Sequence, residues 1–175
     1  FDGSGHHLWS QRFGSPNYDH GSSVAVDGSG NVFATGYFGE TVNFGGGNLT
    51  SAGDSDIFLA KFDGSGNHLW SKRFGSTGRD VGNSVAVDGS GNVFATGRFT
   101  NTVNFGGGNL TSADAEDIFL AKFDGSGNHL WSQRFGSTGY DEGLSVAVDV
   151  AGNVFATGQF QSTVNFGGGN LTSAG

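Results

Sequence analysis

Short stretches that alternate polar or small residues with apolar ones recur along the chain, separated by glycine-rich turns. The first four stretches are residues 23–27, 31–38, 56–63 and 68–75. Alternation with a period of two residues predicts β-strands, and the GSG turns after the first and third stretches predict tight connections. No stretch carries an i, i+3, i+4, i+7 apolar stripe with helix-forming residues, so we expect essentially no helix.

The pattern repeats with a period of 61 residues, which is the spacing of Phe1, Phe62 and Phe123. The three copies are residues 1–61, 62–122 and 123–175, and the last copy is truncated. A period of this length with four short strands is typical of a β-propeller, in which each repeat forms one four-stranded antiparallel blade. We therefore expect an all-β single repeat domain over residues 1–175. Whole blades are predicted at about 23–75 and 84–136, with partial blades at both ends.

The strands of a blade are named a, b, c and d here, from the propeller axis outward. An insertion between strands b and c, TVNFGGGNLTS, contains three consecutive glycines that could turn a small extra hairpin. The chain is expected to begin with strand d and to end after strand b, which leaves an incomplete ring. Either copies of this chain or further blades of the same repeat would then pair with the exposed ends. In the first case, Phe1 to Phe13 would lie near Val146 to Phe160 of the next copy.

The run DIFLAK-F-DGSG-x-HLWS-x-RFG, followed by D-x-G-x-SVAVD-x-x-GNVFATG, resembles the bacterial β-propeller repeat family known as SBBP. The VAVD-x-x-GNV hairpin is also similar, more distantly, to NHL-type blades. The resemblance covers all three copies and implies a propeller on a secreted or cell-surface bacterial protein, usually without known activity. The chain departs from the family pattern in its longer insertion between strands b and c.

Composition narrows the classes of partner. The chain has 175 residues, a net charge of −8 and no run of Lys or Arg, which argues against nucleic acid and anionic membrane surfaces as partners. No apolar run approaches the 18 residues or so of a membrane span. Cysteine is absent, so neither disulfides nor thiolate chemistry is possible. No signal peptide is visible, although the chain starts in the middle of a repeat.

The repeats differ from one another mainly in two connections. The first two copies differ at 13 positions, and 11 of these fall in the d–a and b–c connections. Both connections lie on one face of a propeller, and loops on a rigid scaffold often carry binding residues. Drift under weak constraint is the alternative explanation. The candidate ligand-binding residues on this face are Tyr18, Asp19, Tyr37, Arg79, Asp80, Arg98, Tyr140, Asp141 and Gln159.

Three of these candidates, Asp19, Asp80 and Asp141, are the same residue in every copy. They form either a ring of carboxylates on the variable face or a set of loop caps that accept hydrogen bonds from backbone N–H groups. The aspartates of the DGSG turns are expected to cap their own turns, since the sequence lacks the alternating carboxylates of a calcium loop.

The tryptophans Trp9, Trp70 and Trp131 recur in strand d and are expected to pack between blades, with sugar stacking as the alternative. The histidines lack metal-ligand spacing apart from the adjacent pair His6 and His7, so no metal or other cofactor is expected. No nucleophile or phosphate-binding motif is present, and near-identical blades do not favour the asymmetric site of an enzyme.

We expect a non-enzymatic extracellular binding or scaffold module, with a glycan or a protein as its possible ligand. Two alternatives stay open, a lectin-like glycan binder that uses the b–c and d–a loops, and an engineered or amplified propeller with no ligand. A hydrolase or quinoprotein that lacks its other blades is a more remote alternative.

Overall fold

The computed structural model describes residues 1–174, which contain fourteen β-strands and no helix. The first blade consists of β1 (Asp19–Val26), β2 (Val32–Phe38), β5 (Asp56–Phe62) and β6 (His68–Phe74), with a hairpin of β3 (Thr41–Asn43) and β4 (Asn48–Thr50). The second blade consists of β7 (Val81–Val87), β8 (Val93–Asn104), β9 (Asn109–Phe123) and β10 (His129–Phe135). The third, partial blade consists of β11 (Glu142–Val148) and β12 (Val154–Gln159), with a hairpin of β13 (Thr163–Asn165) and β14 (Asn170–Thr172).

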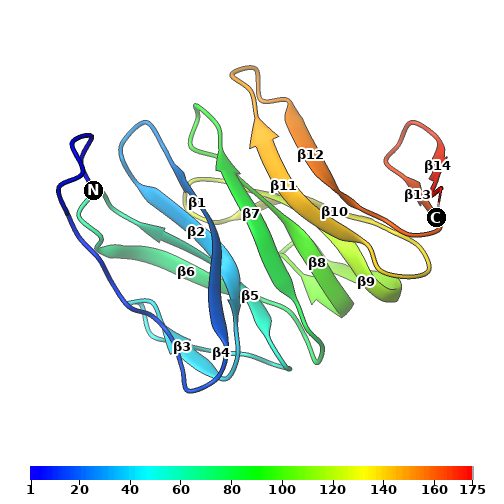
Figure 1. The fold of residues 1–175 in the computed structure, drawn as a ribbon, viewed down its shortest axis with the longest axis horizontal. Helices are drawn as coiled ribbons and strands as arrows, with labels where there is room; N and C mark the ends of the chain where they lie inside the picture. The colour runs from blue at the N-terminus through cyan, green and yellow to red at the C-terminus, as the bar shows by residue number, and fades with distance from the viewer. Residues whose placement is uncertain (175) are drawn as a thin grey trace.

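The two whole blades have the predicted strand order. Their sheets run β1-β2-β5-β6 and β7-β8-β9-β10, and every neighbouring pair is antiparallel. The blades follow one another from the N-terminus to the C-terminus, with the a–b turns at the top of the view and the β3–β4 hairpin at the bottom (Figure 1). The described residues form an open series of blades and no closed ring, as the sequence predicts.

The insertion between strands b and c forms the extra hairpin that its glycines suggested. In the first blade it pairs Val42 with Leu49, whereas in the second it extends β8 and β9 beyond a bulge at Thr100. The turn requires glycine because strand d runs beneath it. A Cβ on Gly46 would lie 2.2 Å from Cε1 of His68, closer than two unbonded carbons can approach.

Adjacent blades contact each other through their a strands. The backbone N–H of Val85 in β7 donates to Ser23 Oγ in β1, at 3.2 Å. One repeat later, the N–H of Val146 in β11 donates to Ser84 Oγ in β7, also at 3.2 Å. Strand a is the edge of each sheet, so a small serine in the neighbouring strand satisfies a backbone donor that would otherwise be unpaired.

The largest apolar cluster crosses the boundary between the whole blades. Phe33 and Leu59 of the first blade join Val93, Phe119 and Phe123 of the second, and each of the five is at most 1 % exposed. Burial between blades is how a repeat that cannot cover both faces of its own sheet becomes stable.

The tryptophans tie successive repeats together at the outer rim. Trp70 Nε1 in β6 donates to the carbonyl of Gly125, in the c–d turn of the second blade, at 3.2 Å. Trp9 Nε1 makes the equivalent bond to Gly64 at 3.1 Å. The predicted role in packing between blades is confirmed for Trp70, whereas Trp9 makes its contact from a segment that forms no strand.

The prediction of a d strand at the start of the chain is wrong. The segment around Trp9 and Phe13 has no strand assignment, because no c strand lies beside it in residues 1–174. It nevertheless lies against the first blade, where the Phe13 ring packs on Phe44 and stacks on Phe62, with centroids 5.1 and 5.3 Å apart.

Candidate functional site

The b–c and d–a connections meet on one face, the loop face, as strand alternation requires. The d–a loop between the first and second blades pairs with the end of the first blade's b–c loop through an isolated bridge between Ser55 and Arg79. The N–H of Asp80 donates to the carbonyl of Ser55 at 2.8 Å. The same bridge recurs between Glu116 and Tyr140. The two variable connections therefore form one continuous surface at each blade.

The invariant aspartates of this face cap the loops from inside. Asp80 is fully buried, and its carboxylate accepts hydrogen bonds from the N–H groups of Ser76 at 2.8 Å and Thr100 at 2.9 Å. Asp141 is also fully buried and accepts from Ser137 at 2.9 Å and Gln161 at 2.8 Å. These two carboxylates are not exposed to a ligand, and their geometry is that of the loop-capping alternative.

Asp19 occupies the same position in the first repeat and is partly exposed. Its Oδ2 accepts from the N–H of Ser15 at 2.5 Å, whereas its Oδ1 has no hydrogen-bond partner. The three aspartates thus lie under three separate loops, and they do not form one carboxylate site.

Burial shifts the pKa of the Asp80 carboxyl group. Removal from water raises its pKa to about 6, although the N–H donors of Ser76 and Thr100 oppose the rise; the nearby Asp56 carboxylate raises it further. Asp56 itself is paired with Arg73. Only a glycine fits beside these carboxylates, since a Cβ on Gly75 would lie 2.6 Å from Asp80 Oδ2.

Between the first and second blades the loop face opens into a pocket of about 320 Å³. The Arg79 guanidinium lies over the Tyr37 ring, 5.3 Å from its centroid, and His20 stacks on the same ring at 5.4 Å. Tyr18 at the rim is 86 % exposed. The pocket is lined by Asn17, Tyr18, Tyr37, Asp54, Ser55 and Arg79. Three of the predicted site residues, Tyr18, Tyr37 and Arg79, therefore come together here.

Between the second and third blades the same place is filled by the protein itself. The carboxylate of Glu142, which is 8 % exposed, accepts a hydrogen bond from Arg98 Nη1 at 3.0 Å and from Tyr140 Oη at 2.9 Å. Gln159 Nε2 donates to it at 3.2 Å, and Asn83 Nδ2 at 3.0 Å. Three further predicted site residues, Arg98, Tyr140 and Gln159, thus satisfy one buried carboxylate. Tyr140 and Gln159 also line a pocket of about 620 Å³ on the third blade.

The residues around which these two groups form were not among the predicted site residues. Glu142 is the centre of the second group, and its counterparts in the other repeats are His20 and Val81. Asp54 lines the first pocket, and its counterpart is Ala115. The available signal was a charged residue at a position where another repeat is apolar.

The opposite face consists of the DGSG turns, each capped by its own aspartate. Asp63 Oδ1 accepts from the N–H groups of Ser65 at 2.8 Å and Asn67 at 2.9 Å, and Oδ2 accepts from Asn67 Nδ2 at 2.8 Å. The hydrogen bond from the Asn67 side chain is the main reason that the pKa of Asp63 lies below its usual range. This is the hairpin-turn geometry expected from the sequence.

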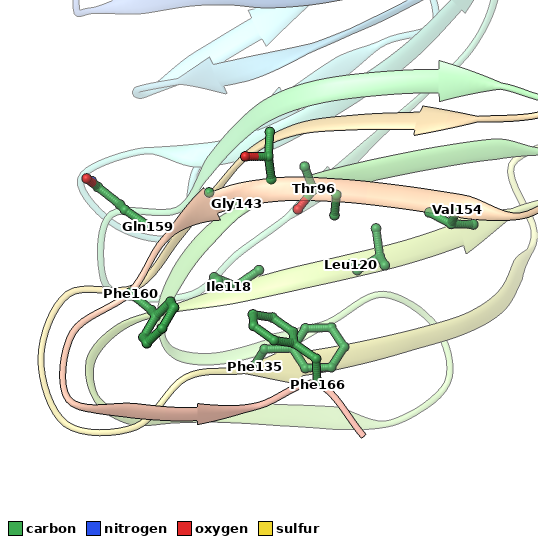
Figure 2. Close-up of a pocket in the computed structure, with 12 residues that line it drawn as sticks. Thr96, Ile118, Leu120, Phe135, Gly143, Val154, Gln159, Phe160 and Phe166 are labelled. Atoms are coloured by element: carbon green, nitrogen blue, oxygen red, sulfur yellow. The ribbon is translucent and has the colours of Figure 1, made fainter. Parts of the chain in front are cut away.

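Two larger apolar pockets lie at the ends of the series of blades, and both match surfaces that are buried between the whole blades. The pocket at the third blade, of about 390 Å³, lies beside the free edge of β12 and is lined by Ile118, Leu120, Phe135, Val154, Ala156, Phe160 and Phe166, among others (Figure 2). One repeat earlier, the corresponding residues are Ile57, Leu59, Phe74, Val93, Ala95, Phe99 and Phe105, which are all core residues. There the space is filled by Phe119, Ala121 and Phe123 of strand c.

The pocket at the first blade, of about 360 Å³, is lined by Phe13, Ala34, Phe38, Val42, Phe44, Phe58 and Phe62, among others. Their counterparts one repeat later belong to the same core and are covered by Phe33, Ile57 and Leu59 of the preceding blade. The two end pockets are therefore the two halves of a contact between blades, and their shape and apolar lining do not indicate a small-molecule site.

The described residues show neither clustered metal ligands nor a membrane-spanning helix. Over residues 1–174 no three His, Asp or Glu side chains come together as possible metal ligands. No helix in that range is long and apolar enough to cross a bilayer. His68 and His129 each bond a serine hydroxyl of their own strand at 3.0 Å.

Comparison with known proteins agrees with this architecture. The family model for the SBBP beta-propeller repeat matches residues 8–37 and 69–101. Each match begins in a d segment and continues through strands a and b of the blade that follows it. The chain is also 45 % identical over 58 residues to an uncharacterized WD repeat-containing protein of Acanthamoeba polyphaga mimivirus. That alignment covers 33 % of this chain and 4 % of the viral protein. The chain is therefore built from β-propeller repeats, and residues 8–37 and 69–101 match the model of the SBBP repeat.

Proposed function

We propose that this chain is a non-enzymatic binding module whose ligand contacts the pocket between the first and second blades. One observation carries the proposal. At the first junction, between the first and second blades, this position on the loop face is open. At the second junction, between the second and third blades, the same position is filled by Glu142 and its hydrogen-bond donors. The open pocket has an 86 % exposed tyrosine at its rim, whose accessible aromatic surface is well suited to binding.

The chemistry of the lining favours a glycan over other ligands. Tyr18 offers an exposed ring face on which a sugar ring can stack, and Asn17 and Asp54 offer amide and carboxylate groups that can hydrogen-bond hydroxyls. Arg79 adds donors at the edge of the pocket. The combination of one aromatic surface with several short polar side chains is consistent with the lectin-like alternative, on a secreted or cell-surface protein.

The two end pockets support a second part of the proposal, which concerns the partner of this chain. Each end pocket has the lining of one half of the buried contact between the whole blades. A further blade of the same repeat has the complementary surface, whether another copy of this chain or a longer chain supplies it. Light scattering tests this part. A stable, well-folded monomer of 18.0 kDa at micromolar concentration would contradict association between copies.

The ligand proposal is tested with a glycan array, followed by titration of the strongest glycan against variants. Tyr18→Ala should weaken binding by about five- to thirtyfold, because it removes an exposed stacking surface worth roughly 1–2 kcal/mol without disturbing the core. Ser65→Ala, in a turn on the opposite face, should leave the affinity unchanged. If Ser65→Ala lost binding and Tyr18→Ala retained it, the site would lie on the face of the DGSG turns, which would contradict the proposal. An array without any binding would exclude the glycan ligand.

A further inference from the structure

The five side chains that meet at the second junction all occupy positions that differ between the repeats. Glu142 corresponds to His20 and Val81, and Arg98 corresponds to Tyr37 and Gln159. Tyr140 corresponds to Tyr18 and Arg79. Asn83, whose counterparts are Ser22 and Leu144, donates both to Glu142 and to the carbonyl of Gly143, the latter at 2.8 Å. Independent drift would not bring one carboxylate and four matching donors to a single point.

The two junctions also hold the same kind of pair with its members exchanged. At the first junction, the arginine of the second blade's d–a loop, Arg79, lies over Tyr37 of the first blade at 5.3 Å. At the second junction, the tyrosine of the d–a loop, Tyr140, lies against Arg98 at 5.0 Å. Both arrangements bring a cation to an aromatic face. If one partner moved to the other junction, arginine would face arginine, or tyrosine would face tyrosine.

We infer that these differences between repeats specify which blade packs on which. Near-identical repeats are prone to pair out of order or with a second chain, since each blade presents almost the same core surface to any neighbour. A buried charge pair adds little net stability, but it penalises every arrangement that leaves one member alone, and setting the pairing order is its best-attested use. This inference concerns assembly and does not depend on the proposed ligand.

Out-of-order pairings fail on named contacts. If the third blade packed on the first, Glu142 would face Tyr37 in place of Arg98, and the carboxylate would be buried without a cation. If one second blade packed on another, Arg98 would face Val81 and Arg79, and two guanidinium groups would be close with no acid supplied by the neighbour. Glu116, 3.9 Å from Arg98 Nε, lies on the blade of Arg98 and gives no information about the neighbour.

The test uses cysteine reporters, which are unambiguous because the native chain has no cysteine. Chains carrying Ser84→Cys and Val146→Cys report the native order, since Ser84 Oγ and the Val146 N–H are hydrogen-bonded. Chains carrying Ser23→Cys and Val146→Cys report the third blade packed on the first. Both are refolded from denaturant at high concentration, oxidised or treated with a short bismaleimide, and analysed for cross-linked products.

Each reporter is examined in the wild-type background and with Arg98→Tyr, Tyr140→Arg and Glu142→Val together. This triple change copies the residues of the first junction onto the second, so it removes the difference between junctions without introducing a foreign contact. The out-of-order reporter should cross-link about tenfold more in the triple background than in wild type, the ratio that roughly 1.4 kcal/mol of preference gives. Equal out-of-order yields in the two backgrounds would overturn the inference.

A second measurement covers the case in which the triple variant fails to fold. Glu142→Val alone leaves Arg98 without the neighbour's acid and should lower the melting temperature. Adding Arg98→Tyr to Glu142→Val should recover part of that loss, because it removes a buried guanidinium that has lost its hydrogen-bonded carboxylate. The inference would fail if the losses in melting temperature were additive. In that case the double variant would melt below Glu142→Val by as much as Arg98→Tyr alone lowers the wild-type melting temperature, and the two residues would act independently.

Discussion

Replacing Trp70 with phenylalanine tests the contact between blades at the outer rim, and the chain supplies a matched control in Trp131. Both tryptophans stand at the same position of strand d and have an edge-to-face partner, Phe33 and Phe94 respectively, at 6.2 and 6.3 Å. Only Trp70 reaches the turn of a following blade, where it donates to Gly125. Trp131 Nε1 has no protein acceptor within residues 1–174.

The difference between the two substitutions isolates the contact between blades. A neutral hydrogen bond contributes about 0.5–1.5 kcal/mol net, and the Gly125 carbonyl keeps a second donor, Lys61 Nζ at 3.1 Å, so no unpaired acceptor adds to the loss. The indole also packs on the turn, since a Cβ on Gly127 would lie 3.2 Å from it. Trp70→Phe should therefore cost about 1–2 kcal/mol more than Trp131→Phe.

The assay is urea and thermal unfolding followed by far-ultraviolet circular dichroism. For a chain of this length, a difference of 1–2 kcal/mol corresponds to a lower melting temperature for Trp70→Phe, by about 2–8 °C. Equal losses in the two variants would refute the contact of Trp70 with the next blade. A larger loss in Trp131→Phe would contradict the account as well, because it would mean that Trp131 makes the stronger contact.

Two further predictions follow from single groups. Because the folded-state pKa of Asp80 is raised to about 6 from an ordinary 3.8, the folded chain binds more protons between these values, so the free energy of unfolding should fall as pH rises from 4 to 6, by up to about 3 kcal/mol. Urea unfolding at pH 4.5 and 7 should show this contribution as a difference between wild type and Asp80→Asn, and identical pH dependence in both would contradict it. Gly46→Ala should cost about 1–3 kcal/mol in thermal unfolding, because the new Cβ would meet His68, whereas Gly168→Ala, whose Cβ would have nothing within 4 Å, should cost little; similar losses would contradict the packing described for the hairpin.

The repeat made most of the fold predictable. Alternation in SVAVD and DIFLAKF placed strands a and c, and the DGSG turns fixed which strands are neighbours, so the a-b-c-d order needed no three-dimensional information. The first d strand was predicted wrongly because alternation describes a side-chain pattern, whereas a strand also needs a hydrogen-bonding neighbour. Leu8 and Trp9 have the pattern without that neighbour.

The candidate site was predictable as a face but not as a set of contacts. Comparing the repeats located the variable loops, and the structure does bring Tyr18, Tyr37 and Arg79 to one pocket. The sequence could not show that Arg98 and Glu142 meet, because they lie 44 residues apart on different blades. It also could not decide between the two interpretations of Asp80, since an identical residue in every repeat is compatible with either a surface carboxylate or a buried cap.

The stacking of successive blades through their a strands is tested most directly by hydrogen exchange at three equivalent amides. The N–H groups of Val85 and Val146 donate to serine hydroxyls of the preceding blade, whereas Val24 stands at the same position of β1 with no blade before it in the described chain. Exchange followed by NMR should show strong protection at Val85 and Val146 and fast exchange at Val24. Equally fast exchange at all three amides would contradict the stacked-blade architecture, whereas protection at Val24 as well would indicate association between copies.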